Sequence, residues 1–157
     1  MANETSSYTW ARIKDGKPFF AEVLLDVEPD PVRSRIIECY TGKGFTGQGN
    51  IEEAGHETYH SWKTGAARGL EYAFAMIHTH WTVYMKGISG RAFTDTNPVI
   101  VGYAVWRAFF AKINHQPDEL LISRIEEFVF RSWTAPFDEV VPDFFTLTFE
   151  NYNEQRK

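Results

Sequence analysis

His56, Glu57 and His60 form the pattern H-E-x-x-H. On a helix, the two histidines would lie one turn apart and bind Zn²⁺, and the glutamate would activate a metal-bound water as general base. Glu71 cannot be the third ligand on that helix, because eleven residues correspond to about 16 Å along its axis. The pattern therefore gives one hypothesis, a zinc hydrolase with Glu57 as catalytic base and His56 and His60 as metal ligands. Its third ligand would have to come from more distant residues such as Asp95, His115 or Asp118.

A glycine-rich segment, Gly42-Lys43-Gly44-Phe45-Thr46-Gly47, matches G-x-G-x-x-G between a predicted strand and a predicted helix. In dinucleotide sites such glycines let the backbone approach a pyrophosphate, and an acidic residue about twenty positions later binds the ribose. Here that position falls in residues 68–71, inside a predicted helix instead of after a strand. Phosphate binding by this loop is therefore an alternative, and a plain connection between strand and helix is the simpler interpretation.

Two further groups have weaker patterns. His78 and His80 would share one side of a strand as a nonspecific metal pair. Cys39 is the single cysteine, so no intrachain disulfide can form and a reducing compartment is expected. We expect Cys39 to be a small buried residue and not a nucleophile, because no histidine is assigned near it.

The elements around residues 81–113 are the clearest. Residues 81–87 alternate in polarity and predict a strand, and Ser89-Gly90 predicts a turn. Asp95, Thr96 and Asn97 before Pro98 predict a helix start. The apolar stripe of that helix comprises Ile100, Val101, Ala104, Val105, Ala108, Phe109 and Ile113.

The remaining elements follow from turn residues and periodicity. Residues 8–13 and 18–27 predict a hairpin through Lys14-Asp15-Gly16-Lys17, and residues 33–41 contain a third strand. A long helix, whose stripe runs from Ile51 to Ile77, is expected to start between residues 54 and 59, and a third helix spans residues 118–133. Residues 144–149 predict a final strand.

Composition limits the classes of partner. A chain of 157 residues fits a single domain, and a net charge of −5 with a pI near 5.5 disfavours DNA and anionic membranes as partners. The chain has no targeting segment and no apolar run of membrane-spanning length, so a cytoplasmic location is expected. An aromatic share of 16% is high enough to supply a buried interface, which makes a homodimer one expectation.

The order strand, strand, strand, helix, strand, helix across residues 18–113 resembles domain IV of the elongation factor G family, which has the ribosomal protein S5 domain 2-like fold. Several motifs carry the resemblance. They are Val23-Leu24-Leu25-Asp26-Val27-Glu28-Pro29, similar to a family strand ending in Glu-Pro; Gly42-Lys43-Gly44-Phe45, similar to Gly-x-Gly-Phe; Tyr59, Lys63 and Gly65; Ser89-Gly90 with Asp95-Thr96, similar to an Asp-Gly turn and Asp-Ser helix entry; and the alanines from Ala104 to Ala108.

The resemblance implies an α+β fold, with a mainly antiparallel sheet, a split β-α-β core and helices packed on one face. The domain IV-like core would cover about residues 18–114, and the N-terminal hairpin and the C-terminal helix and strand would be additions. In the family this domain enters the ribosomal decoding site through its tip loops, but this chain lacks a GTPase domain and the long glycine-rich tip loop.

We therefore expect a non-catalytic binding or assembly module without a cofactor, with zinc as the cofactor of the alternative. Its partner would be an unidentified protein or ribonucleoprotein, and a role in translation is one expectation. The expected contact residues are Gly42, Lys43, Gly44, Gly47, Asp95, Thr96 and Asn97.

Overall fold

The computed structural model describes residues 7–44, 51–92, 94–134 and 140–152. Its main sheet comprises β1 Ser7–Lys14, β2 Lys17–Pro29, β3 Arg35–Glu38, β4 Glu52–Glu53 and β5 Trp81–Gly90. The helices are α1 His60–Ala75, α2 Pro98–Lys112 and α3 Glu119–Phe130, with a short 3₁₀ turn at Ser132–Thr134. A separate hairpin near the C-terminus comprises β6 Val140–Asp143 and β7 Thr148–Asn151.

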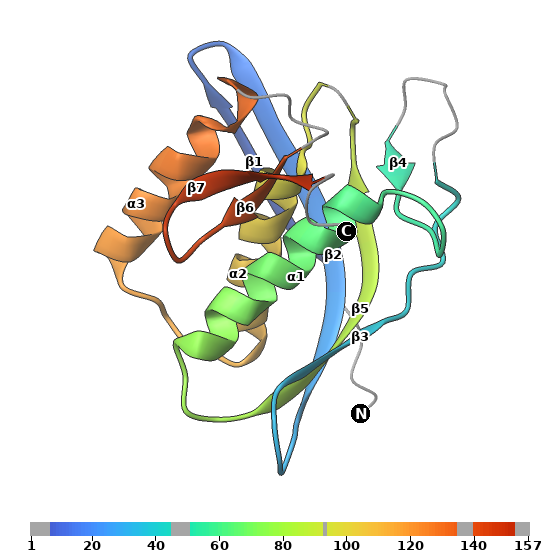
Figure 1. Ribbon diagram of the computed structural model, residues 1–157, viewed down its shortest axis with the longest axis vertical. Coiled ribbons are helices and arrows are strands. Elements are labelled where there is room, and N and C mark those ends of the chain that lie inside the picture. The colour runs from blue at the N-terminus through green and yellow to red at the C-terminus, as the bar shows by residue number, and fades with distance from the viewer. Residues whose placement is uncertain (1–6, 45–50, 93, 135–139, 153–157) are drawn as a thin grey trace.

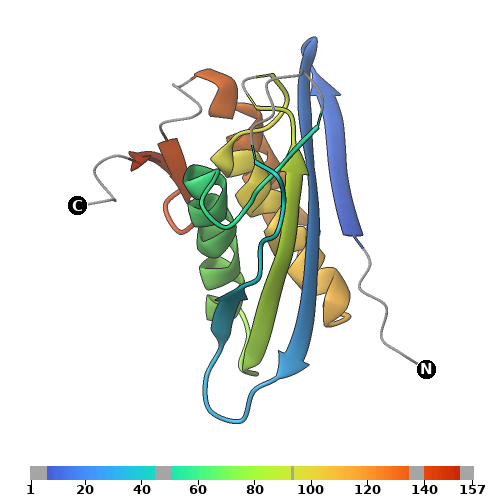
Figure 2. The ribbon, with the colours of Figure 1, turned by 90° about the vertical axis from the view of Figure 1, so that its right-hand side faces the viewer.

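The sheet has the order β1-β2-β5-β3, and β4 pairs with the end of β5. All neighbouring strands are antiparallel except β3 and β5, which are parallel and connected through α1. Figures 1 and 2 show the helices on one face of this sheet. The α+β class and the mainly antiparallel sheet are thus confirmed. One detail differs from the expectation: β3 and β5 are direct neighbours, so no strand splits the β-α-β unit.

The β1–β2 hairpin forms as predicted. Lys14 pairs with Lys17, and the two residues between them, Asp15 and Gly16, have φ values of 52° and 77°. Positive φ at both central positions is the geometry of a two-residue turn that follows the twist of the sheet, and Asp-Gly favours it.

Strand β5 is longer than predicted, and the turn at Ser89-Gly90 is wrong. Ser89 still pairs with Glu22 and Gly90 with Glu52, so the strand continues through Gly90 and the chain turns after it. A Cβ at Gly90 would lie 2.3 Å from Thr96 Oγ1. The glycine is therefore needed for close approach of the returning chain and not for a turn.

Helix α2 begins at Pro98 as predicted, because the side chain of Asn97 accepts a hydrogen bond from Ile100 N. Its stripe residues Ile100 to Phe109 are buried, and the helix is also buried on its other sides at Val99, Tyr103 and Trp106. The reason is its position, with contacts to β2, α1, α3 and β6. A helix in that position needs apolar residues all round.

Helices α1 and α2 pack backbone to backbone. A Cβ at Gly65 would lie 2.2 Å from Pro98 O, and a Cβ at Gly69 would lie 2.2 Å from Gly102 O. The predicted helix contains these glycines but begins later, at His60 with Tyr59 as N-cap. Ile51 is 46% exposed and lies before β4, so it does not belong to the helical stripe.

The C-terminal part of the prediction is half right. Helix α3 begins after Asp118, whose carboxylate accepts hydrogen bonds from Leu120 N and Leu121 N. The predicted strand at residues 144–149 is wrong, because a turn separates β6 and β7 there. Asp143 starts that turn, because its carboxylate accepts hydrogen bonds from Phe145 N and Thr146 N. These two amides therefore bond to a side chain and not to a neighbouring strand.

The turn between β2 and β3 makes stability depend on pH. Asp30 accepts hydrogen bonds from Arg33 N and Val32 N and from the hydroxyl of Thr82, which hold the pKa of its carboxyl well below the usual range. A depressed pKa in the folded state stabilises the protein above the unfolded value of about 4, and this stabilisation is lost as the pH falls below it.

We therefore expect the Asp30→Asn variant to lose less stability than the wild type between about pH 4 and pH 2. Urea denaturation at pH 6, 4, 3 and 2 measures this difference. Asp15→Asn, in the exposed hairpin turn, is the control. Parallel pH profiles of Asp30→Asn and the wild type would contradict the assignment.

Among the described residues, no helix has both the length and the hydropathy needed to cross a membrane.

Candidate functional site

Three connections lie toward one end of the sheet, which we call the loop end: the hairpin turn, the segment 41–44 and, between β5 and α2, residues 91, 92 and 94–97 (Figure 1). Hydrogen bonds tie them together. Phe20 N donates to Asp95 O at 2.8 Å, and Trp133 Nε1 donates to Pro18 O at 3.0 Å. The segment 41–44 is linked to residues 94–97 through β4 and β5, because Gly44 pairs with Glu53, Glu52 pairs with Gly90, and Thr96 packs against Gly90.

The glycine-rich segment is not a phosphate cradle in its described part. The amide of Gly42 donates to Ala54 O and that of Gly44 donates to Glu53 O, so neither N–H is free for an anion. Strand β4 and residues 54–59 separate the segment from α1, whereas a phosphate loop leads directly into a helix. Lys43 is exposed between the two glycines, and Gly47 lies outside the described residues.

The helix entry at residues 95–97 stabilises the loop end, mainly through buried hydrogen bonds. Thr96 and Asn97 are each 1% exposed. Thr96 Oγ1 donates to Phe20 O and accepts from Arg91 N, while Asn97 Nδ2 donates to Ser132 Oγ. Direct contact of these two side chains with a partner therefore does not fit their burial. Asp95 lies 3.6 Å from Arg91 in an ion pair at the surface.

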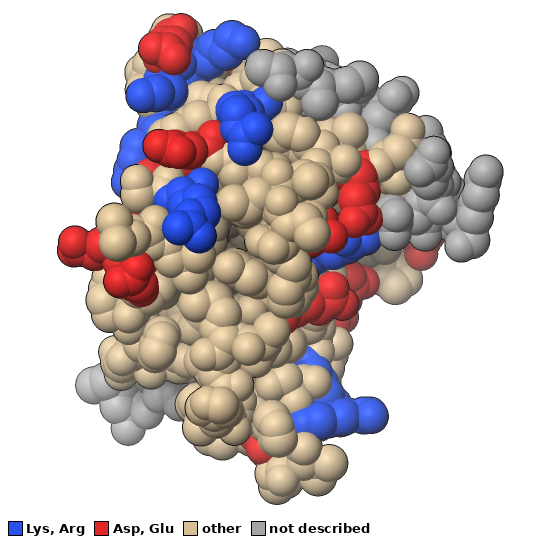
Figure 3. All heavy atoms as spheres, turned by 60° about the vertical axis from the view of Figure 1, so that its left-hand side comes forward, with Lys and Arg blue, Asp and Glu red and all other residues tan. Residues whose placement is uncertain are grey.

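Exposed cations surround this end although the chain as a whole is acidic. Lys14, Lys17, Lys43 and Arg91 are all exposed there, and Figure 3 shows Lys and Arg side chains gathered around the hairpin end, with acidic side chains between them. The sequence interpretation missed Lys14 and Lys17. Their position next to the Asp-Gly turn was the available signal, because a turn places its flanking residues at a tip.

The H-E-x-x-H pattern does not lie on one helix. Helix α1 begins at His60, so His56 and Glu57 precede it in a turn. Their side chains are 89% and 79% exposed and pair with each other at 3.2 Å. The expected arrangement of two histidines one helical turn apart is therefore wrong. Within the described ranges, no three His, Cys, Asp or Glu side chains lie close enough together to hold a metal.

The start of α1 depends instead on a buried lysine. Lys63 is 6% exposed, and its Nζ donates to Gly55 O at 2.8 Å and to His56 O at 3.0 Å. The amine also lies 5.4 Å from the ring centroid of Tyr40. Lys63 thus fixes the backbone of the residues that the motif had singled out. The N-cap Tyr59 stacks on Trp62, and burial together with nearby Glu52 raises the pKa of Tyr59 to about 12.

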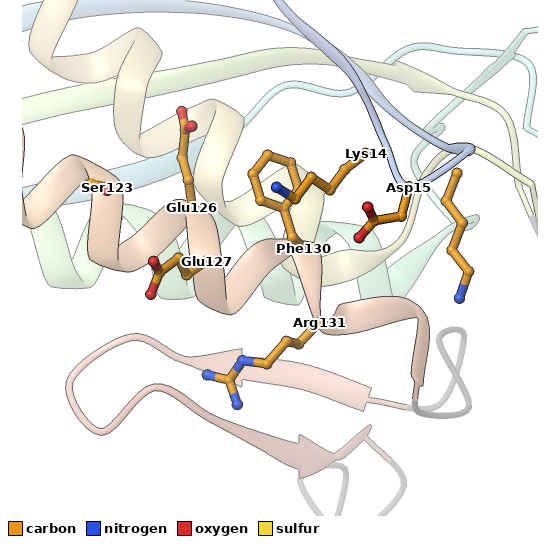
Figure 4. Close-up of a pocket in the computed structure, with 8 residues that line it drawn as sticks. Lys14, Asp15, Ser123, Glu126, Glu127, Phe130 and Arg131 are labelled. Carbon is orange, nitrogen blue, oxygen red and sulfur yellow. The ribbon is translucent and has the colours of Figure 1, made fainter.

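A wedge-shaped cavity of about 640 Å³ opens between the hairpin and α3. We call it the wedge, and it is lined by Lys14, Asp15, Lys17, Ser123, Glu126, Glu127, Phe130 and Arg131. Figure 4 shows Lys14 and Asp15 reaching from the hairpin toward Phe130 and the side of α3 that carries Glu126. Glu126 is held in place, because it accepts from Tyr103 Oη at 2.5 Å and lies 3.7 Å from Arg107.

A second hollow, of about 340 Å³, crosses β2 and β5 beside the glycine-rich segment. Gly42 and Lys43 line it together with Glu53 and Lys86. Of the predicted contact residues, these two therefore border an open space.

The remaining predicted groups are dispersed. His78 and His80 are exposed in the connection between α1 and β5, so they do not share a strand face. Cys39 is exposed and not buried as expected, because it follows the last residue of β3.

No protein-family model and no curated protein matches the chain. Among solved structures, it is similar to part of a protein from Thermus thermophilus, with 10% sequence identity over 65% of this chain and a TM-score of 0.46. The matched part spans 14% of the length of that protein. A similarity at this identity and TM-score identifies neither a family nor a function.

Proposed function

We propose that the chain is a non-catalytic binding or assembly module with an elongation factor G domain IV-like fold, and that its loop end contacts a protein or ribonucleoprotein partner. The observation that carries the proposal is the position of the hairpin turn, the segment 41–44 and residues 94–97 toward one end of the sheet (Figure 1). The element order and the helices on one face of a mainly antiparallel sheet (Figures 1 and 2) support the resemblance in fold.

The chemistry of the loop end supports an anionic partner surface. Lys14 and Lys17 are exposed beside the hairpin turn, and Lys43 is exposed in the segment 41–44. Because the chain carries a net charge of −5, long-range attraction to a polyanion is weak. The contact should therefore be local and sensitive to salt.

Co-sedimentation of the purified protein with ribosomes tests the translational form of this proposal. We expect the double variant Lys17→Glu and Lys43→Glu to bind about tenfold more weakly at 0.1 M salt, since losing cationic contacts with phosphates lowers affinity. The same experiment at 0.3 M salt should weaken the wild type more than the variant.

The matched control is the double variant Arg33→Glu and Arg124→Glu, which makes the same change in net charge at exposed positions away from the loop end. It should co-sediment like the wild type. An equal loss in both variants would point to net charge alone, and no co-sedimentation of the wild type would remove the ribosomal partner.

A further inference from the structure

The outer edge of β1 carries backbone N–H and C=O groups that point away from β2. Because Lys14 and Lys17 flank a two-residue turn, they form a hydrogen-bonded pair, and every second residue of β1 back to Tyr8 also bonds to β2. Ser7, Thr9, Ala11 and Ile13 consequently direct their N–H and C=O groups away from the sheet. Within the described part of the chain, no strand pairs with this edge.

One side-chain hydrogen bond lies along this edge. The carbonyl of Ala11 accepts a hydrogen bond from Nη1 of its own neighbour Arg12, at 2.8 Å. A charged side chain folded over an edge carbonyl is a common protection against unwanted strand pairing. Unlike a strand or a covering helix, it can move aside when a partner offers backbone donors.

The wedge lies next to this edge. Its wall on α3 is formed by Ser123, Glu126, Glu127 and Phe130, which follow each other at helical spacing and face the hairpin (Figure 4). A strand added to β1 would therefore lie between a sheet edge and a helix. In that geometry, main-chain hydrogen bonds provide affinity and a side-chain pocket provides specificity.

Two cationic side chains of β1, those of Arg12 and Lys14, lie on the face of the sheet that the helices cover. Arg12 lies 5.5 Å from the centroid of Trp10, and Lys14 lies 5.7 Å from that of Phe130. Neither forms an ion pair with a carboxylate among the described residues. The acidic side chains that line the wedge are Asp15, Glu126 and Glu127. Glu126 already accepts a hydrogen bond from Tyr103 and forms an ion pair with Arg107.

The other side of β1 is apolar near the hairpin, where Ile13 is 79% exposed. In two paired strands, directly opposed side chains contact each other. If a further strand paired with β1, opposite charges and apolar pairs between the two strands would therefore be favourable. A strand with carboxylates opposite Arg12 and Lys14 and an apolar residue opposite Ile13 would match both sides.

We propose that β1 binds an extended peptide segment of a protein partner, which adds to the outer edge of the sheet as a sixth strand and carries acidic residues at alternate positions facing the wedge. This site shares Lys14 with the loop-end contact surface but does not need the ribosomal partner. A failure of either proposal would therefore leave the other in place.

The test uses the fluorescein-labelled peptide Thr-Glu-Val-Glu-Val-Thr and its analogue with lysine in place of both glutamates, with binding measured by fluorescence polarisation. The wild type should bind the glutamate peptide at least tenfold more tightly than the lysine peptide. In the double variant Arg12→Glu and Lys14→Glu this preference should reverse, because the charges on β1 are exchanged.

The main-chain part of the proposal is tested at Ala11, whose N–H points away from β2. Ala11→Pro removes this donor without breaking the β1–β2 ladder and should weaken binding at least tenfold. Ala11→Val keeps the donor and should bind like the wild type. Thermal melting shows whether each variant is folded, and methylation of the peptide amides that face β1 gives the same information without a protein variant.

The proposal is overturned if the wild type binds neither peptide, if the amide-methylated peptide binds like the unmodified one, or if the charge exchange leaves the preference unchanged. Sedimentation of the protein alone distinguishes one further case. A homodimer that Ala11→Pro dissociates would show that a second copy occupies the edge, and would overturn the peptide as its occupant.

Discussion

Replacing Gly69 with alanine is expected to lower the free energy of unfolding by about 2 to 3 kcal/mol, although alanine is the better helix former. In a helix interior the substitution alone would stabilise by about 1 kcal/mol. Here, however, the added Cβ would lie 2.2 Å from the carbonyl oxygen of Gly102, which belongs to the backbone of α2. Backbone cannot rotate away as a side chain can, so the two helices must separate and lose packing along their contact.

Urea denaturation followed by tryptophan fluorescence measures this loss. The matched control is Gly87→Ala in β5, where the nearest atom to the new Cβ is Leu24 Cβ at 3.4 Å, an ordinary contact. We expect a change below about 1 kcal/mol there. If Gly69→Ala stabilised the protein by the helix propensity alone, the close approach of α1 and α2 would be wrong.

Replacing Lys63 with methionine should cost about 2 to 4 kcal/mol of stability, because a hydrogen bond from a charged donor contributes about 1.5 to 3 kcal/mol and the carbonyls of Gly55 and His56 both lose this donor. Methionine fills nearly the same volume, so the loss reports the hydrogen bonds of the amine to Gly55 and His56 and not a cavity. The effect should be concentrated at the start of α1.

Hydrogen exchange of the amides in residues 54–58 provides the local measurement, and it should accelerate more than exchange in β5. Lys86→Met is the control, since Lys86 forms an ion pair with Asp26 at the surface and its loss should cost much less stability than that of Lys63. Equal losses in the two variants, with unchanged exchange in residues 54–58, would show that Lys63 does not hold this turn.

The parts of the fold that follow from local chemistry were predictable. Asp15-Gly16 specifies the turn by its own backbone preference, and Asn97 before Pro98 specifies a helix start whatever surrounds it. The failures arose where tertiary packing decides. Gly90 resembles a turn residue in sequence, but it is a strand residue because Thr96 packs against it. Asp143, directly before the alternating residues 144–149, starts a turn where the alternation predicts a strand.

The candidate site was less predictable for the same reason. Residues that attract attention by type, His56 and Glu57, are exposed in a turn, while Lys63, which has no motif, is buried and organises that turn. The sequence correctly placed Thr96 and Asn97 at the start of a helix. It did not indicate that both side chains are buried and form hydrogen bonds inside the protein. The wedge could not be seen in the sequence, because it joins Lys14 to Phe130 across more than a hundred residues.

The central position of β5 affects how the chain can assemble during synthesis. Strand β5 pairs with β2, β3 and β4, yet residues 81–90 leave the ribosome after all three of these partners. The hairpin of β1 and β2 can form early. Trp10 and Phe19, however, are covered only when Phe130 on α3 has been synthesised and packs against them. Non-local contacts of this kind slow folding and leave apolar surface exposed in the meantime. Nascent chains stalled before residue 90 should therefore be the most dependent on chaperones.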